Sequence, residues 1–200
     1  MSRRALILSV AVAIVLGVGT YYLMSLRRHM APSHASTLRS EQKARTQLNE
    51  AALQAGGQAQ TLTLYFPSYA DGNLVAETRS VKLSSDNVKA IRQILLALIE
   101  GSHQGHGSAL SPSTTIRAVF LTSDGTAIVD LSQEALADFQ PGIESESLAI
   151  YSIVDSVCAN LPAAKEVKFL VQGQEAQTLD GHIDLTGSFA PEPSLIAQTH

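Results

Sequence analysis

The sequence predicts an α+β fold: a two-layer sandwich in which two main helices pack on a mixed sheet of five to six short strands, preceded by one N-terminal transmembrane helix. The transmembrane helix is predicted by an uncharged run of twenty residues, Ala5–Met24. The strands are predicted by short segments that alternate apolar and polar residues, which is typical of a half-buried sheet. The helices are predicted by two longer segments, 86–100 and 145–160, in which apolar residues recur at helical spacing.

The apolar run Ala5–Met24 is interpreted as an uncleaved, single-pass anchor in the cytoplasmic membrane. At the rise of a helix it spans about 30 Å, the thickness of a hydrocarbon core. Residues 1–4 form a basic n-region that we expect in the cytoplasm. The alternative is a signal peptide, whose apolar core usually has about 7–15 residues. The nearest cleavage-like site, Ser33–Ala35, lies well beyond the run, and no cysteine stands near its end for lipid attachment.

Charge counting alone favours a cytoplasmic domain, since the positive-inside rule places the more basic flank in the cytoplasm. The basic residues that follow the run are Arg27, Arg28, Arg39, Lys43 and Arg45. Residues 25–60 are interpreted as a basic, partly helical linker, because the helix formers of 40–56 lead into Gly56-Gly57, a typical helix end.

Residues 61–189 are predicted to form the globular domain, followed by a flexible tail over 190–200. Apolar and polar alternation and turn signals predict strands in the order Thr61–Phe66, Glu77–Leu83, Thr115–Leu121, Thr126–Leu131 and Glu166–Val171. Pro67 is expected to end the first of them. Short extended pieces are predicted at Gln177–Leu179 and His182–Leu185.

Two long helices are predicted to cover this sheet. The first spans Asp86–Glu100 with Ser84 or Ser85 as its N-cap. The second opens at Ser145 and runs to about Asn160, and a short helix from Ser132 to Phe139 precedes it.

Composition restricts the class of protein. Of the 200 residues, 45% are hydrophobic and 16% charged, which excludes a disordered or low-complexity chain. Residues 61–200 carry seven Lys or Arg against sixteen Asp or Glu. This net charge of −9 argues against nucleic-acid binding, because a phosphate groove needs clustered basic residues. The single cysteine, Cys158, excludes an intramolecular disulfide and a Cys-rich metal site.

Several residues could in principle carry chemistry. His103 and His106 have the spacing of two metal ligands, but only Glu100 stands near as a third, so we expect a mobile polar loop rather than a metal site. Asp130 could be a general base. An aspartate before a Ser-capped helix more often binds backbone N–H groups, and we expect that role.

The remaining candidates also favour a structural interpretation. Asp124, Asp130 and Glu134 could supply a glycosidase carboxyl pair, but any acidic protein offers such a trio. Cys158 lies on the apolar stripe of its predicted helix, so we expect an inert thiol. The sequence contains no nucleophile elbow, P-loop or dinucleotide fingerprint. We therefore predict no catalytic, cofactor-binding or metal-binding residues and identify no small-molecule substrate.

A series of short motifs follows in order across 61–189. They are Leu64–Pro67, Leu74–Arg79, Leu110–Thr114, Asp124–Ser132, Ser147–Ile150, Val167–Gly173 and Gly181–Leu185. Their order and spacing resemble the GerMN domain, also called the sporulation and spore-germination domain. The sequence departs from the family at Gly101-Ser102, where a Gly-Pro pair is usual, and at Gln172, where an aspartate is usual.

The resemblance implies a non-catalytic module of the cell envelope, held outside the cytoplasmic membrane, in the periplasm where there is one. It also implies a protein partner or self-association, in a sporulation, germination or envelope accessory role. It outweighs the charge count and favours an outward domain. The alternative is a cell-wall glycan-binding protein or hydrolase of the envelope, which the lack of a reaction centre in the sequence disfavours.

Overall fold

The computed structural model describes residues 32–54, 57–136, 142–178 and 182–197. The expected anchor, Ala5–Met24, lies outside these residues, as do Phe139 and Leu179, the predicted ends of two elements. Within the described ranges, no helix is long and apolar enough to cross a membrane. The chain divides into two compact units, Met1–Thr46 and Gln47–His200.

Helix α2, Pro32–Gln54, contains most of the helix expected in the linker. Its last turns belong to the second compact unit. The Ala52 side chain is buried, and its carbonyl oxygen accepts a hydrogen bond from Nε2 of Gln93 at 2.7 Å. Asn49 Oδ1 accepts one from Nη1 of Arg92, also at 2.7 Å. The end of the linker is therefore part of the folded domain.

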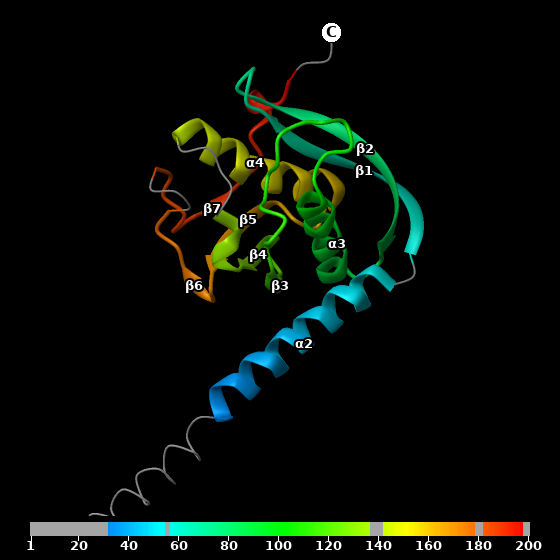
Figure 1. Cartoon of the computed structure of the whole chain (residues 1–200). Helices are drawn as coiled ribbons and strands as arrows, with labels where there is room; N and C mark the ends of the chain where they lie inside the picture. The colour runs from blue at the N-terminus through cyan, green and yellow to red at the C-terminus, as the bar shows by residue number, and fades with distance from the viewer. Residues whose placement is uncertain (1–31, 55–56, 137–141, 179–181, 198–200) are drawn as a thin grey trace, which may run out of the picture. The chain divides into compact units, whose positions relative to one another are not determined.

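The first two strands form a hairpin of their own (Figure 1). Strand β1 spans Gly57–Ser68 and pairs antiparallel with β2, Asn73–Ser84. The prediction that they belong to the same sheet as the later strands is therefore wrong, and both are longer than expected. Pro67 does not end β1, because its nitrogen faces away from β2 and no ladder hydrogen bond is lost.

The mixed sheet has five strands, which agrees with the predicted number, but two of the strands are not the ones predicted. Antiparallel strands β3 (Ile116–Leu121) and β4 (Thr126–Leu131) are followed by β5 (Glu166–Val171), which runs parallel to β4. Two-residue strands β6 (Gln174–Glu175) and β7 (Ser188–Phe189) pair antiparallel with different parts of β5. They replace the extended pieces predicted nearby.

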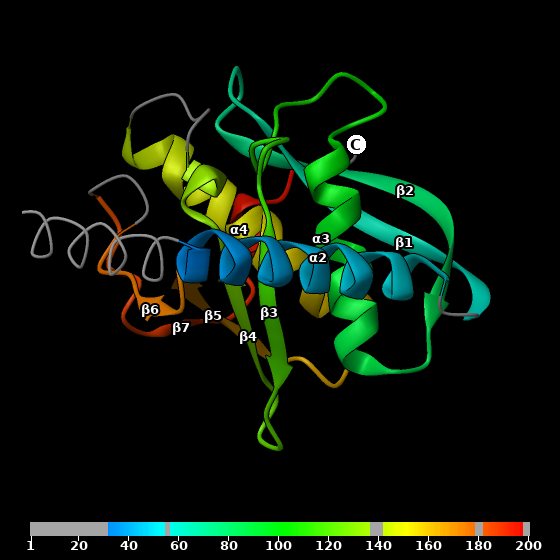
Figure 2. The same cartoon turned by 60° about the horizontal axis from the view of Figure 1, so that its bottom comes forward.

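Helices α3, Asn87–Glu100, and α4, Ile143–Asn160, each contact the hairpin on one side and the five-stranded sheet on the other (Figures 1 and 2). The α+β class is thus confirmed, although the helices have strands on two sides rather than one. The N-cap of α3 is Asp86, whose carboxylate accepts the N–H of Lys89 at 2.9 Å, and not Ser84 or Ser85. Two 3-10 helices complete the chain: η1, Gln133–Leu136, and η2, Pro193–Leu195.

One hydrophobic core joins all layers. Its largest fully buried side chains include Phe66, Leu62, Leu64, Ile91, Ile94, Leu95, Leu98 and Phe169. Burial of each such side chain stabilises the fold by about 1.5–3 kcal/mol.

A polar stripe on α4 closes the edge of β1 that faces away from β2. Ser156 Oγ accepts the N–H of Tyr65 at 2.9 Å. Asn160 accepts the N–H of Thr63 at 2.9 Å and donates to the Thr63 carbonyl at 2.6 Å. Ser152 donates to the carbonyl of Tyr65. Because the three α4 residues are four apart, they lie on one helix face and satisfy a strand edge that would otherwise be open.

Candidate functional site

The loop that follows α3 is fixed by a buried carboxylate. Glu77 on β2 is only 2% exposed and accepts hydrogen bonds from Ser102 Oγ at 2.7 Å and from the His103 N–H at 3.2 Å. Arg79 donates to the same carboxylate at 2.7 Å and also to the Gly101 carbonyl. Burial alone would raise the pKa of Glu77, but these hydrogen bonds and the Arg79 charge overcome it and hold the pKa at about 2.

The two histidines of this loop do not form a ligand set. His103 is exposed, with Nε2 at 3.2 Å from Glu100 Oε1. The N–H of His106 donates to Ser102 Oγ at 3.1 Å, while its buried Nε2 has no partner among the described residues. No group of three potential metal ligands occurs in the described part of the chain. The loop is also tied to the hairpin where the Gly107 N–H donates to the Pro67 carbonyl at 2.8 Å.

Asp130 stabilises a tight turn. It is buried near the end of β4 and accepts the N–H of Gly173 at 2.9 Å and Nε of Arg117 at 3.2 Å. Arg117 also donates to the side chain of Gln172, which has a positive φ of 57°. The expected role in binding a backbone N–H is confirmed, but the N–H belongs to the turn after β5 and not to the helix after β4.

Asp124 and Asp130, two carboxylates of the acidic trio considered above, do not come together. Asp124 lies in the turn before β4 and Asp130 near the end of that strand, so the extended stretch from Thr126 to Asp130, about 13 Å, separates them. Glycosidase carboxyl groups are about 5–9.5 Å apart. Asp124 instead accepts a hydrogen bond from Thr122 in its own turn, which, with the N–H of Thr126, lowers its pKa. Glu134 lies in η1, where hydrogen bonding from Ser132 lowers its pKa.

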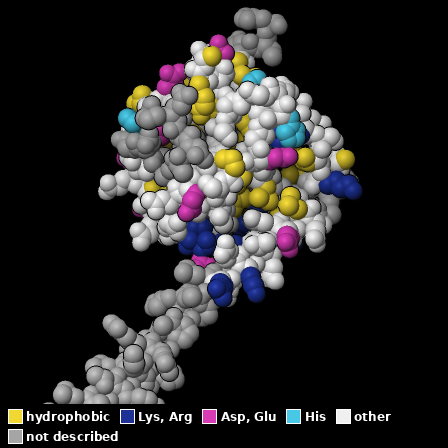
Figure 3. Space-filling view, in the orientation of Figure 1, with side chains coloured by type: hydrophobic (Ala, Val, Ile, Leu, Met, Phe, Trp, Pro, Cys, Tyr) yellow, Lys and Arg dark blue, Asp and Glu magenta, His cyan; other side chains and the backbone are white. Residues whose placement is uncertain are grey.

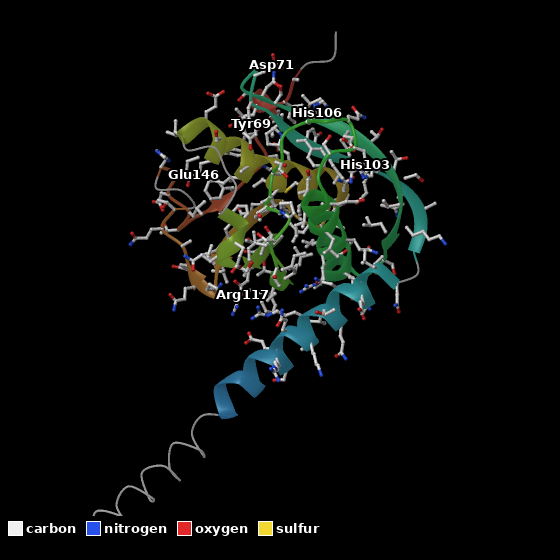
Figure 4. All side chains as sticks on the ribbon, in the orientation of Figure 1. Tyr69, Asp71, His103, His106, Arg117 and Glu146 are labelled. Carbon is white, nitrogen blue, oxygen red and sulfur yellow. The ribbon has the colours of Figure 1, made fainter. Side chains whose placement is uncertain are left out.

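The structural roles of two buried carboxylates on α4 could not be predicted from the sequence, because their hydrogen-bond partners follow about 36 residues later. Glu146 is almost fully buried and accepts the N–H groups of His182 and Ile183 at 2.9 and 3.3 Å. Asp155 is likewise buried and accepts the N–H of Glu192 at 3.1 Å. Both carboxylates therefore fix segments that follow β5. Figure 4 shows Glu146, His103 and Arg117 on separate parts of the domain, so these charged groups do not converge.

Cys158 is half-buried near the end of α4. Burial, with smaller contributions from the charges of Asp155 and Glu166, raises the pKa of its thiol to about 11. The reactive thiolate is therefore disfavoured at neutral pH, as expected for an inert cysteine.

The outer edge of β2 presents backbone groups to solvent. Thr63 and Tyr65 of β1 direct their N–H groups away from β2, and Thr78 and Ala76 stand opposite them. When one residue of an antiparallel pair directs its N–H and C=O groups away from the partner strand, the opposite residue does the same, so the backbone groups of Thr78 and Ala76 point away from β1. Backbone groups alternate in direction along a strand, so those of Ser80 also point away from β1. No described residue pairs with the outward backbone groups of Ala76, Thr78 and Ser80, which we call the open edge.

The chain itself covers β2 on both sides of the open edge. Towards the hairpin turn, the N–H of Ala197 donates to the Leu74 carbonyl at 2.8 Å. At the other end, Gln93 of α3 donates to the Lys82 carbonyl at 3.2 Å and accepts the Ser84 N–H at 2.8 Å. The open edge is therefore a window between two closed stretches.

An apolar hollow of about 400 Å³ lies between β2 and α3 next to this window. Its aliphatic lining comes from Leu53, Leu62, Val81, Leu96 and Ala97, and its polar lining from Lys82, Gln93 and Glu100. Figure 3 shows hydrophobic side chains gathering on this face over α3. Leu53, one of the residues that line the hollow, is 65% exposed. The open edge and the hollow together form the candidate binding site.

Comparison with known proteins identifies the fold. A family model described as "Sporulation and spore germination" (Germane) matches residues 63–177. Among curated proteins, none matches the sequence. The tandem GerMN domains of the sporulation protein GerM from Bacillus subtilis share 22% identity and a TM-score of 0.50 over 64% of this chain. This chain spans 44% of that tandem structure. The first GerMN domain of the same protein shares 22% identity and a TM-score of 0.49, over 63% of this chain and 92% of that one.

Proposed function

Since this chain belongs to the sporulation and spore germination (Germane) family, we propose that it is a non-catalytic module of the cell envelope that binds a protein partner or self-assembles. Residues 5–24 anchor it in the cytoplasmic membrane, with the domain outside. The observation that carries the proposal is the open edge of β2, because unpaired N–H and C=O groups on a strand are a template for pairing with another chain.

The arrangement of the acidic residues supports a binding role over a catalytic one. Glu77, Asp130, Glu146 and Asp155 each accept backbone N–H groups from a segment distant in the sequence. A general acid or base instead needs a side chain aimed at a substrate, within hydrogen-bond reach of the proton it transfers. The net charge of −9 over residues 61–200 favours association with a basic surface, which added salt weakens.

Site-specific photocrosslinking in living cells tests the proposal. A photoreactive residue in place of Thr78, on the open edge, is expected to capture one defined envelope protein or a second copy of this chain. The matched control is Ser123, an exposed residue in the turn between β3 and β4, which is expected to capture neither. Identical capture from both positions, or none from either, would contradict the proposal.

The alternative envelope hydrolase makes a different prediction. Purified full-length protein is expected to release no fragments from isolated cell wall. If it does release them, and Asp130→Asn abolishes the release while the circular dichroism spectrum and melting temperature stay unchanged, the enzyme function replaces the one proposed here.

A further inference from the structure

We propose that the open edge of β2 and the adjoining hollow bind one extended peptide segment of a partner protein, which adds to the hairpin as a third strand and places an apolar side chain in the hollow. This inference rests on the proposed function and specifies its mode of recognition. Strand addition of this kind takes affinity from main-chain hydrogen bonds and specificity from pockets for alternate side chains.

The edge already pairs with one residue of this chain. Ile196 forms a parallel bridge with Leu74, and the next N–H, that of Ala197, donates to the Leu74 carbonyl at 2.8 Å. The open edge begins two residues further along β2, at Ala76, and continues through Ser80. A partner segment there finds backbone groups with the same orientation as those at Leu74.

The side chains along the window favour pairing. Ala76, Thr78 and Ser80 are exposed, small or β-branched, and uncharged. Natural edge strands are commonly protected by lysine or proline on the edge, by a bulge or by inward-pointing charged residues, and of these only the last occurs between Ala76 and Ser80. These inward charges, Glu77 and Arg79, are paired with each other, and Arg79 also donates to the Gly101 carbonyl, so they leave the outward backbone groups uncovered.

The hollow lies where alternate side chains of an added strand would point. In a strand, successive side chains face opposite sides of the sheet, and one side of the hairpin faces α3. Two contacts bridge β2 and α3 on either side of the hollow: Arg79 donates to the Ala97 carbonyl at 3.3 Å, and Gln93 donates to the Lys82 carbonyl at 3.2 Å. Val81 and Leu96 line the space between them.

The chemistry of the hollow selects the occupant. Its volume of about 400 Å³ falls in the range of ligand pockets, and its lining is mainly aliphatic. An apolar side chain there covers Leu53 and Leu96, while Lys82, Gln93 and Glu100 supply the polar part of the lining. We assign the site to a peptide with an apolar residue and not to a wall glycan, because the adjoining open edge offers backbone groups that pair with another backbone.

The test uses random nine-residue peptides displayed on phage, selected against the full-length chain in detergent micelles. Enriched peptides are expected to share an apolar position. Affinity for a synthetic copy, measured by fluorescence polarisation, is expected to fall at least tenfold in Thr78→Pro. The N–H of Thr78 points outward, so proline removes a donor to the peptide but no hydrogen bond of the hairpin.

A second variant probes the hollow. Leu53→Asp places a charge among its aliphatic residues and is also expected to reduce affinity at least tenfold. Leu53 is exposed, so the substitution leaves the core intact. The matched controls are Thr78→Ser, which keeps the donor, and Leu48→Asp, at an exposed leucine on the same helix that does not line the hollow. Both controls are expected to bind normally.

Hydrogen exchange gives an independent measurement. Bound peptide is expected to slow amide exchange over residues 76–80. The inference is overturned if no peptide is enriched, if binding survives both Thr78→Pro and Leu53→Asp, or if protection appears only elsewhere. Should Thr78 still crosslink an envelope protein in cells in those cases, the proposed function stands and only this mode of recognition falls.

Discussion

The carboxylate of Asp155 accepts the N–H of Glu192 through one oxygen, while its other oxygen is buried without a partner among the described residues. The side chain is 3% exposed. Burial raises the pKa of Asp155, and the nearby Glu192 carboxylate raises it further, against the lowering effect of the Glu192 N–H, to about 6. The folded state therefore binds this proton more tightly than the unfolded chain, whose aspartates titrate near 3.8.

Asp155→Asn is expected to stabilise the protein at pH 7. Because the pKa is raised on folding, the free energy of unfolding falls as the pH rises from about 4 to about 6 and stays low above that. Asparagine keeps an acceptor for Glu192 without the buried charge, so the gain at pH 7 reaches up to about 3 kcal/mol, at about 1.4 kcal/mol per pKa unit. Urea unfolding at pH 4 and pH 7 measures it.

The control for this prediction is Asp86→Asn, at the exposed N-cap of α3, where asparagine caps about as well as aspartate. It is expected to change stability by less than about 0.5 kcal/mol at either pH. Equal stability of wild type and Asp155→Asn at pH 7 would show that the Asp155 charge is not destabilising.

Glu77→Gln is expected to destabilise the fold by about 3 kcal/mol, because it removes the buried counter-charge of Arg79 and leaves only the exposed Glu100 carboxylate, at 3.5 Å. The pKa of Glu77 is lowered on folding, so its stabilising effect is present above about pH 4.5 and is lost as the pH falls towards 2. Limited proteolysis is expected to cut the variant faster within 101–115. Glu175→Gln removes a surface ion pair with Lys168 and is expected to cost less than about 1 kcal/mol. Similar losses in both variants would contradict the structural role of Glu77.

Asn160→Ala is expected to cost about 1–3 kcal/mol, since it leaves the N–H and C=O of Thr63 without a partner. Combined with Ser156→Ala, it also opens the outer edge of β1 and is expected to cause concentration-dependent association, measured by sedimentation velocity. The control is Ser147→Ala, on the first turns of the same helix, which is expected to show no more association than wild type. A monodisperse double variant would show that α4 does not protect this edge.

The sequence was sufficient to predict most helices and strands but not how the strands are grouped. Alternation along Thr61–Phe66 indicates which side chains are buried, and these residues are indeed core. It carries no information on whether the outer edge meets another strand or a helix. That edge is satisfied by Ser156 and Asn160, about 95 residues later, which look like ordinary polar positions of an amphipathic helix.

The candidate site was beyond sequence reasoning for a related reason. Whether Thr78 directs its backbone groups outward depends on the register with β1, and a shift by one residue would reverse it. The hollow likewise depends on the end of α2 lying beside α3, where Asn49 contacts Arg92. The role of Asp130 in binding an N–H group was predictable because it depends on local residue type, but the identity of its partner, Gly173, was not.

The domain boundaries have a measurable consequence. A fragment comprising residues 47–197 is expected to unfold cooperatively at a higher temperature than one comprising residues 61–191. The longer fragment keeps the buried Ala52 and its bond to Gln93, and it keeps Ala197, which pairs with Leu74. A difference of about 2 kcal/mol corresponds to roughly 4–8 °C for a domain of this size. Neither chelator nor reductant is expected to shift either transition. Equal melting temperatures would place both flanking segments outside the cooperative unit.

Residues 5–24 are expected to hold the full-length chain in the membrane through carbonate extraction, because a twenty-residue apolar helix matches the hydrocarbon thickness. A reporter that becomes active only after export, fused behind His200, is expected to be active. Fusion there keeps Ala197 on β2, whereas fusion behind Phe189 would remove it. The matched variant replaces Arg3 and Arg4 with glutamate, which should weaken the outward orientation, since the basic residues between 27 and 45 then dominate. Activity only from a cytoplasmic reporter, or a mature protein that begins near Ser36, would overturn the anchored, outward-facing arrangement.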